Sequence, residues 1–143
     1  MNNRQIGPAI REISLQIRNR VNELVNNKVN GVTQMNAHIL HILRVEEEKG
    51  RELCQKDLEG LLTISKSTMC EMLNCMERHD YIVRVSSKDD SRKKVIKLTE
   101  LGRSVDDEVG VVIKDYESIL SKRITPEEKI LLFNILDKLK EDK

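Results

Sequence analysis

Two short segments rich in β-branched residues, 82–85 (IVRV) and 95–98 (VIKL), flank the charged and polar run SSKDDSRKK. Segments of this length, bounded by polar turn residues, are typical of two antiparallel strands. The run between them would form the tip of a hairpin. The pattern therefore predicts a small β-hairpin that holds charged side chains away from the body of the protein.

Charge is unevenly distributed along the chain. The net charge is only +1, but residues 82–99 carry six basic and two acidic side chains, a net charge of +4. Residues 100–143 carry eight basic and eleven acidic side chains, a net charge of −3. Such asymmetry points to a polyanionic partner at the basic segment.

Apolar residues recur every three or four positions on both sides of the hairpin, which predicts helices. We expect these helices at about 4–27, 34–48, 53–62 and 66–79, with two more that begin near 100 and 126. The first should end at Asn30-Gly31. Thr33, Ser65 and Thr125 are expected N-caps, and Glu128 should complete a capping box with Thr125.

The helix expected at 66–79 has two contrasting sides. Its core stripe consists of Met69, Met72, Leu73 and Met76. The opposite line is polar and consists of Ser67, Glu71, Asn74 and Arg78. A short helix and a tight break at residues 63–64 precede it, and the basic hairpin follows. This order suits a helix-turn-helix with a wing, because a helix can present polar side chains to base edges while basic hairpin residues neutralise phosphates.

Residues 55–102 resemble the winged helix-turn-helix of the MarR-type transcriptional regulators. The marks are SKST (65–68), Asp90-Ser91-Arg92 and LTELG (98–102) in this order, with a Gly-x-Thr break before them. The resemblance covers nearly the whole chain. It implies a single domain, 1–143, that is mainly α-helical with about six helices and a small β-hairpin wing. It also implies a dimerisation region of helices from 1–50 and 100–143, and a DNA-binding region at 51–99.

The same resemblance implies a homodimer that binds a pseudo-palindromic operator in double-stranded DNA, with two recognition helices in successive major grooves. The dimer would act as a repressor that a small ligand or a stress signal releases. In this assignment Gln55 bonds a phosphate, Arg92 reaches the minor groove or a phosphate, and Asp90 steadies Arg92. The residues assigned to DNA binding are Gln55, Ser65, Lys66, Ser67, Thr68, Glu71, Asn74, Arg84, Lys88, Asp90, Arg92, Lys93 and Lys94.

Three positions depart from the family pattern. Glu71 stands where the family often has Arg or another polar residue; its carboxylate repels phosphate but can accept a hydrogen bond from cytosine N4. Cys54 replaces the usual Ser or Thr cap before Gln55. Asp80 occupies a common Gly position, and Asp tolerates the left-handed conformation better than most residues.

Two alternative functions stay open. The protein could respond to thiol oxidation through Cys70 or Cys75, although redox-sensing members of the family generally carry the reactive cysteine in the first helix. It could also be a dimeric protein-binding module that has lost DNA binding. Glu71 and Cys54 favour that alternative, whereas the intact wing opposes it.

Other classes of function lack a pattern in the chain. No HExxH, GxSxG or Gly-rich phosphate loop occurs, so we expect neither an enzyme nor a cofactor. His38 and His41 lie on one helix, but residues 100–123 hold no further histidine, so we expect no metal site. The three cysteines form no CxxC pair. The N-terminus lacks a signal peptide and no apolar run approaches a membrane span, which favours a cytoplasmic protein without a membrane partner.

Overall fold

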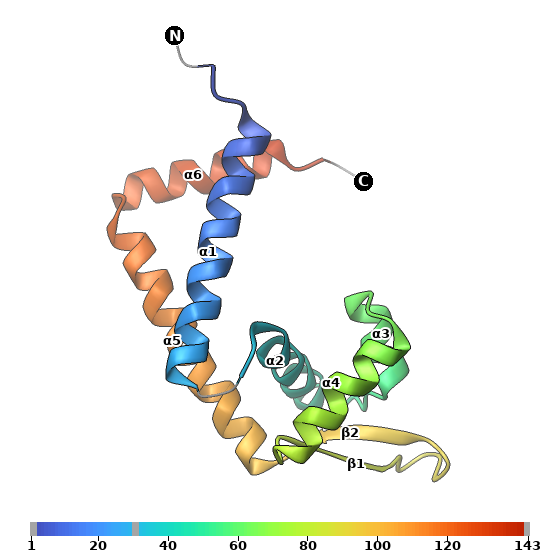
Figure 1. The fold of residues 1–143 in the computed structure, drawn as a ribbon. Coiled ribbons are helices and arrows are strands. Elements are labelled where there is room, and N and C mark those ends of the chain that lie inside the picture. The colour runs from blue at the N-terminus through green and yellow to red at the C-terminus, as the bar shows by residue number, and fades with distance from the viewer. Residues whose placement is uncertain (1–2, 30–31, 142–143) are drawn as a thin grey trace.

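Helices dominate the computed structural model, which describes residues 3–29 and 32–141. Within these residues the chain forms six helices and one two-stranded sheet, which confirms the predicted fold class. In chain order the elements are α1 (Ile6–Lys28), α2 (Gln34–Glu48), α3 (Gln55–Leu62), α4 (Lys66–Arg78), β1 (Ile82–Ser86), β2 (Lys94–Leu98), α5 (Glu100–Lys122) and α6 (Pro126–Leu139). Figure 1 shows α6 and much of α1 at one end, and α3, α4 and the hairpin at the other.

The predicted N-caps are present at the helix starts. The hydroxyl of Thr33 accepts a hydrogen bond from the backbone N–H of Asn36 at 3.1 Å. Thr125 and Glu128 form the expected capping box, with reciprocal bonds of 2.8 and 3.1 Å to each other's backbone N–H. Ser65 caps α4 in the same way. Local side-chain chemistry therefore fixes where these helices begin.

The third helix starts later than predicted. We expected it from residue 53, but it begins at Gln55. Leu53 instead forms an isolated bridge with Ile96, and its carbonyl accepts the backbone N–H of that residue at 2.8 Å. The pairing holds Leu53 in an extended conformation and ties the start of α3 to the hairpin. The predicted end of the first helix at Asn30-Gly31 lies outside the described residues.

Two tight turns place α4 between its neighbours. Thr63 has φ 53°, in the left-handed region, and separates α3 from α4. Asp80 has φ 62° directly after α4, which confirms the expectation that this position needs the left-handed conformation. These two residues set the directions in which the chain enters and leaves α4.

The sheet is a simple antiparallel hairpin. Ile82 pairs with Leu98 at its base and Ser86 pairs with Lys94 near its tip. Ile82 is fully buried, whereas Val83 and Val85 are exposed. The base of the hairpin therefore packs into the protein while its tip projects, as Figure 1 shows.

One hydrophobic core joins the hairpin to the helices. Its members include Val25, Ile39, Leu40, Leu58, Met69, Leu73, Met76, Ile82, Ile96, Val105 and Val109. Burying one such side chain stabilises the fold by about 1.5–3 kcal/mol. Since α4 contributes Met69, Leu73 and Met76, with Met72 partly buried against the core, the predicted apolar stripe is its inner side.

The other end of the subunit leaves apolar surface uncovered. No residue of α6 is buried, although the helix is rich in large apolar side chains. Six of them are between 44% and 65% exposed, namely Ile130, Leu131, Leu132, Phe133, Ile135 and Leu139. Ile6, Ile10 and Ile13 of α1 are exposed as well. In Figure 1, α6 and this half of α1 lie at the end away from the hairpin.

Candidate nucleic-acid interface

The start of α4 is a cluster of exposed hydroxyl groups. The Ser65 hydroxyl accepts the backbone N–H of Thr68 at 3.3 Å and lies 3.0 Å from the Thr68 hydroxyl. Ser67 and Lys66 are exposed beside them. A helix N-terminus carries unpaired N–H groups and a partial positive charge, which favours an anion such as a phosphate. These side chains therefore offer hydrogen bonds at a place where the phosphate backbone of a nucleic acid would also be favoured electrostatically.

Gln55 connects the start of α3 to this cluster. Its side-chain amide donates a hydrogen bond to the carbonyl of Lys66 at 3.3 Å. The same turn of α3 holds Asp57, whose carboxylate accepts the backbone N–H of Cys54 at 2.9 Å. That bond, aided by the nearby Lys93 and Lys56, lowers the pKa of Asp57 below its ordinary value. Asp57 thus satisfies the backbone N–H of the N-cap residue Cys54 and completes a capping box at the start of α3.

The outer side of α4 is polar along its length but not uniformly open. Ser67, Glu71 and Arg78 are exposed, as predicted. Asn74 is half-buried, because its carbonyl oxygen accepts a hydrogen bond from Nη1 of Arg84 at 2.9 Å. Arg84 comes from the middle of β1, so the hairpin covers this part of the helix. The exposed part of this polar side therefore comprises the N-terminal half of α4 and its C-terminal end.

The tip of the hairpin is an ordered, basic turn. Asp90 accepts hydrogen bonds from the backbone N–H of Arg92 at 3.0 Å and from its Nε at 3.4 Å. The Arg92 side chain is nevertheless 91% exposed. Lys88 and Lys93 are exposed too, and Lys94 bonds the Ser86 hydroxyl at 3.2 Å. Asp90 therefore orients Arg92 without covering its guanidinium group.

The sequence-predicted residues thus fall into three groups. The first lies at the start of α4 and comprises Gln55, Ser65, Lys66, Ser67, Thr68 and Glu71. The second lies at the hairpin tip and comprises Lys88, Asp90, Arg92, Lys93 and Lys94. The third, Asn74 and Arg84, lies where α4 and β1 meet, and its two members bond each other. Figure 1 shows α4 beside the hairpin, with the tip projecting past it.

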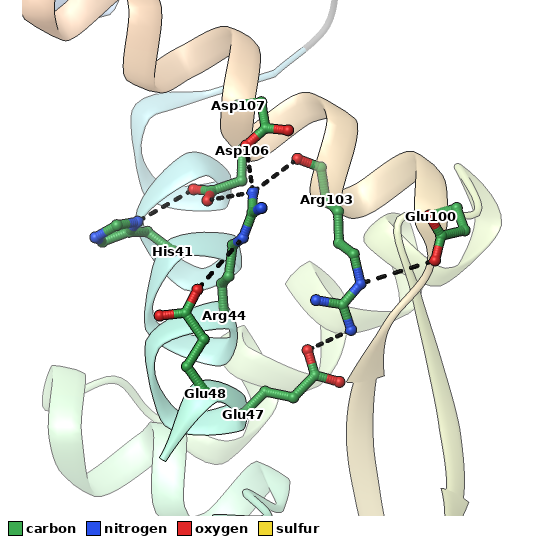
Figure 2. Close-up of polar contacts among 8 residues, drawn as sticks. All are labelled: His41, Arg44, Glu47, Glu48, Glu100, Arg103, Asp106 and Asp107. Carbon is green, nitrogen blue, oxygen red and sulfur yellow. Dashed lines mark hydrogen bonds and ion pairs between the residues drawn. The ribbon is translucent and has the colours of Figure 1, made fainter. Parts of the chain in front are cut away.

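A polar network that the sequence did not reveal joins α2 to α5. Asp106 is buried in this network, where it accepts hydrogen bonds from His41 and from Arg44, both at 3.2 Å. Arg44 also bonds Asp107 and the carbonyl of Arg103. Figure 2 shows these groups converging between the two helices, with further ion pairs to Glu47, Glu48 and Glu100 at the edge. In the sequence, the only indication of this network was that the acidic residue Asp106 follows the core position Val105.

The remaining cysteine and histidine residues have local partners. Cys54, Cys70 and Cys75 are half-buried free thiols. Sulfur of Cys70 lies 3.6 Å from the Asn74 amide nitrogen, and sulfur of Cys75 lies 3.8 Å from Nδ1 of His79. Among the described residues, no three His, Cys, Asp or Glu side chains come together in a way that could hold a metal ion. His38 is exposed on α2.

Comparison with known proteins gives a family match over the region that holds these residues. Residues 32–102 match the family model described as the winged helix DNA-binding domain. No curated protein sequence matches the chain. None of the described helices has the length and hydropathy that crossing a membrane requires.

Several solved structures share the fold over nearly the whole chain. MepR, a transcription regulator of the Staphylococcus aureus multidrug efflux pump MepA, has 22% sequence identity and a TM-score of 0.85, covering 96% of this chain and 100% of its own. The apo form of wild-type MarR from E. coli has 18% identity and a TM-score of 0.76, covering 98% and 100%. A complex of S. aureus MepR with DNA has 22% identity and a TM-score of 0.74, covering 96% and 97%. At these identities the likeness establishes the fold.

Proposed function

This chain has a winged helix DNA-binding domain in the fold of the MarR-type regulators, and on that premise we propose that it binds operator DNA as a homodimer and represses transcription. The carrying observation is the exposed polar start of α4 beside a basic hairpin tip. The N-terminal half of α4 would enter the major groove, where Ser67, Thr68 and Glu71 read base edges. The hairpin tip would lie along the neighbouring backbone, where Arg92 meets a phosphate or the minor groove.

The homodimer is supported by the uncovered apolar side chains of α6 and α1. So many exposed large apolar side chains on one helix are unusual for a monomeric protein and point to an interaction surface. Full burial of one Leu, Ile or Phe side chain contributes about 1.5–3 kcal/mol, so covering even part of the α6 set would stabilise an assembly. A second copy fits best, because a twofold pair would carry two copies of α4 and so read a pseudo-palindromic site.

A small ligand would release the repressor through the region between α2 and α5. A groove of about 340 Å³ lies there, lined in part by His41, Arg44 and Asp106. Its charged groups also hold α2 against α5, so a ligand that competes for them would change how the DNA-binding region sits on the long helices. Such a ligand shifts the protein between arrangements only if it binds one of them more tightly.

The test compares duplex binding by the wild type and by a variant in which Lys88, Arg92, Lys93 and Lys94 are replaced with Gln. We expect this variant to lose on the order of tenfold or more in affinity for a labelled mixed-sequence duplex at moderate salt. The control variant removes the same charge from α5, its C-cap residue and α6. Its substitutions are Lys114→Gln, Lys122→Gln, Arg123→Gln and Lys138→Gln.

The control should bind nearly as tightly as the wild type. Equal losses in both variants would mean that only net charge matters, which contradicts the proposed interface. A wild-type protein that dimerises but binds no duplex at low salt would favour the protein-binding alternative instead.

A further inference from the structure

Arg84 occupies a position where the hairpin would ordinarily carry an apolar side chain. Side chains alternate along a strand, so Arg84 points to the same side of β1 as the fully buried Ile82. Its side chain is only 26% exposed. A charged group in such a place must find partners, because burying an unpaired charge is costly.

The partners of Arg84 come from α4. Nη1 donates to the carbonyl oxygen of Asn74 at 2.9 Å and lies 3.7 Å from a carboxylate oxygen of Glu77. Asn74 and Glu77 are three residues apart, so they lie on neighbouring parts of one helix face. Within the described residues, Nη2 of Arg84 is buried and has no hydrogen-bond partner. The guanidinium group is therefore anchored to α4 at one end only.

A half-buried arginine at this position contributes less to stability than an apolar residue would. An apolar side chain of similar volume would fill the position without the cost of desolvating a charge. A hydrogen bond differs from an apolar contact in being directional, and so it fixes the angle between two elements. The amide nitrogen of Asn74 also lies 3.6 Å from the Cys70 sulfur, so both ends of the Asn74 amide are engaged inside the protein.

We propose that Arg84 and Asn74 position the wing on the recognition helix and do not themselves contact DNA. This inference rests on the proposed function and assigns these two residues a different role from the other predicted contacts. The hairpin extends about 13 Å beyond Arg84, at roughly 3.3 Å per residue over four residues. A tilt of about 10° at the anchor would therefore move the tip by about 2 Å, enough to break a hydrogen bond to DNA.

The first experiment needs no DNA. Backbone ¹⁵N relaxation of the hairpin amides is compared in the wild type, Arg84→Met and Arg20→Ala. Methionine keeps the apolar stem and packing of Arg84 but cannot bond Asn74. We expect Arg84→Met to melt within a few degrees of the wild type and to show increased motion at the hairpin tip. Arg20→Ala removes a charged side chain from α1 and should leave the tip unchanged. An equally ordered tip in Arg84→Met would overturn the proposal.

The second experiment measures binding to a selected operator and to random duplexes. Arg84→Met should lower operator affinity by tenfold or more when the wing is otherwise intact, but should leave the salt slope unchanged when it is added to the variant in which Lys88, Arg92, Lys93 and Lys94 are already replaced with Gln. Arg92→Ala should then weaken operator binding much less in the Arg84→Met background than in the wild type, because the displaced tip no longer brings Arg92 within reach of the DNA. A slope that falls by about one further unit when Arg84→Met is added to that four-residue variant would show a direct phosphate contact by Arg84 and overturn the inference.

Asn74→Ala supplies a variant that breaks the same bond from the helix side. If the two residues act as one anchor, the loss of operator affinity in the double variant should match that of either single variant. Independent DNA contacts would instead give losses that multiply. If the wild type selects no operator, the proposed function fails, but the relaxation experiment still decides whether Arg84 anchors the wing.

Discussion

Gly102 packs so closely against the carbonyl oxygen of Tyr81 that a Cβ atom at position 102 would come within 3.0 Å of that oxygen, a separation that real Cβ atoms do not show. Thr99 links the same two segments by hydrogen bonds. Its hydroxyl donates to the carbonyl of Asp80 and accepts the backbone N–H of Gly102 at 2.9 Å. The glycine thus lets the start of α5 meet the turn that follows α4. This close approach explains why the LTELG motif ends in glycine.

Replacing Gly102 with Ala should destabilise the protein by roughly 1–3 kcal/mol, because a backbone oxygen cannot move aside without shifting the turn. Gly110 is the matched control on the same helix, since a Cβ atom there would meet nothing within 4 Å. Gly110→Ala should stabilise by roughly 0.5–1 kcal/mol. Urea denaturation of both variants measures the difference. Changes of the same sign and size would show that the Tyr81 contact has no energetic weight.

The Asp57 carboxylate should make stability depend on acid pH. Its folded pKa lies below the ordinary value of 3.8, chiefly because it accepts the Cys54 backbone N–H. The stabilisation is therefore fully present above pH 3.8 and is lost as the pH falls through the folded pKa. Asp57→Asn should be less stable than the wild type at neutral pH, and this gap should narrow in acid. Asp89→Asn controls for losing a negative charge, and an unchanging gap for Asp57→Asn would count against this account.

Arg92→Ala should weaken binding to every duplex alike. Its side chain is 91% exposed and steadied by Asp90, so it is free to meet a phosphate. Removing one phosphate contact should reduce the slope of log affinity against log salt by about one unit. Fluorescence anisotropy across a salt series gives that slope. An unchanged slope would take Arg92 off the list of phosphate contacts.

Glu71→Gln should change sequence preference more than overall affinity. The carboxylate is exposed in the N-terminal half of α4, where it can accept a hydrogen bond from cytosine N4. Losing that pairing should cost about 1–3 kcal/mol at one base pair of the operator. Affinities for single-base operator variants test this. A uniform gain across all of the duplexes would mean that Glu71 only repels the backbone.

Phe133→Asp should shift the protein from dimer to monomer. Phe133 is 51% exposed on a helix that buries none of its residues within the subunit. A carboxylate at a buried dimer contact would be desolvated without a partner. Lys138→Ala changes the net charge by the same amount on the same helix and should leave the dimer intact. Sedimentation at several concentrations distinguishes the species, and a dimeric Phe133→Asp would remove α6 from the interface.

The sequence was sufficient for the elements whose signals are local. The 3.6-residue periodicity located the helices, and the hydroxyl caps at Thr33, Ser65 and Thr125 located their starts to within a residue. The β-branched segments gave the hairpin. The expectation for Asp80 came instead from the family resemblance, in which this position is commonly Gly, and its φ of 62° agrees with it.

Contacts between distant segments could not be predicted in the same way. Leu53 looked helical by its position, but its pairing with Ile96 depends on where the hairpin folds back. Helical periodicity put Asn74 on the outer line of α4, and only the path of β1 shows that Arg84 reaches it. The partners of Asp106 come from a helix more than sixty residues away. Each of these contacts depends on tertiary packing, which overrides local pattern.

Selection of bound duplexes from a random DNA pool tests the central claim most directly. If paired copies of α4 read DNA, the enriched sequences should contain an inverted repeat with half-sites about 10 base pairs apart, centre to centre. Enrichment should be lost when Ser67 and Thr68 are both replaced with Ala. A pool that shows no enrichment over its input, or enriched sequences without twofold symmetry, would contradict the account.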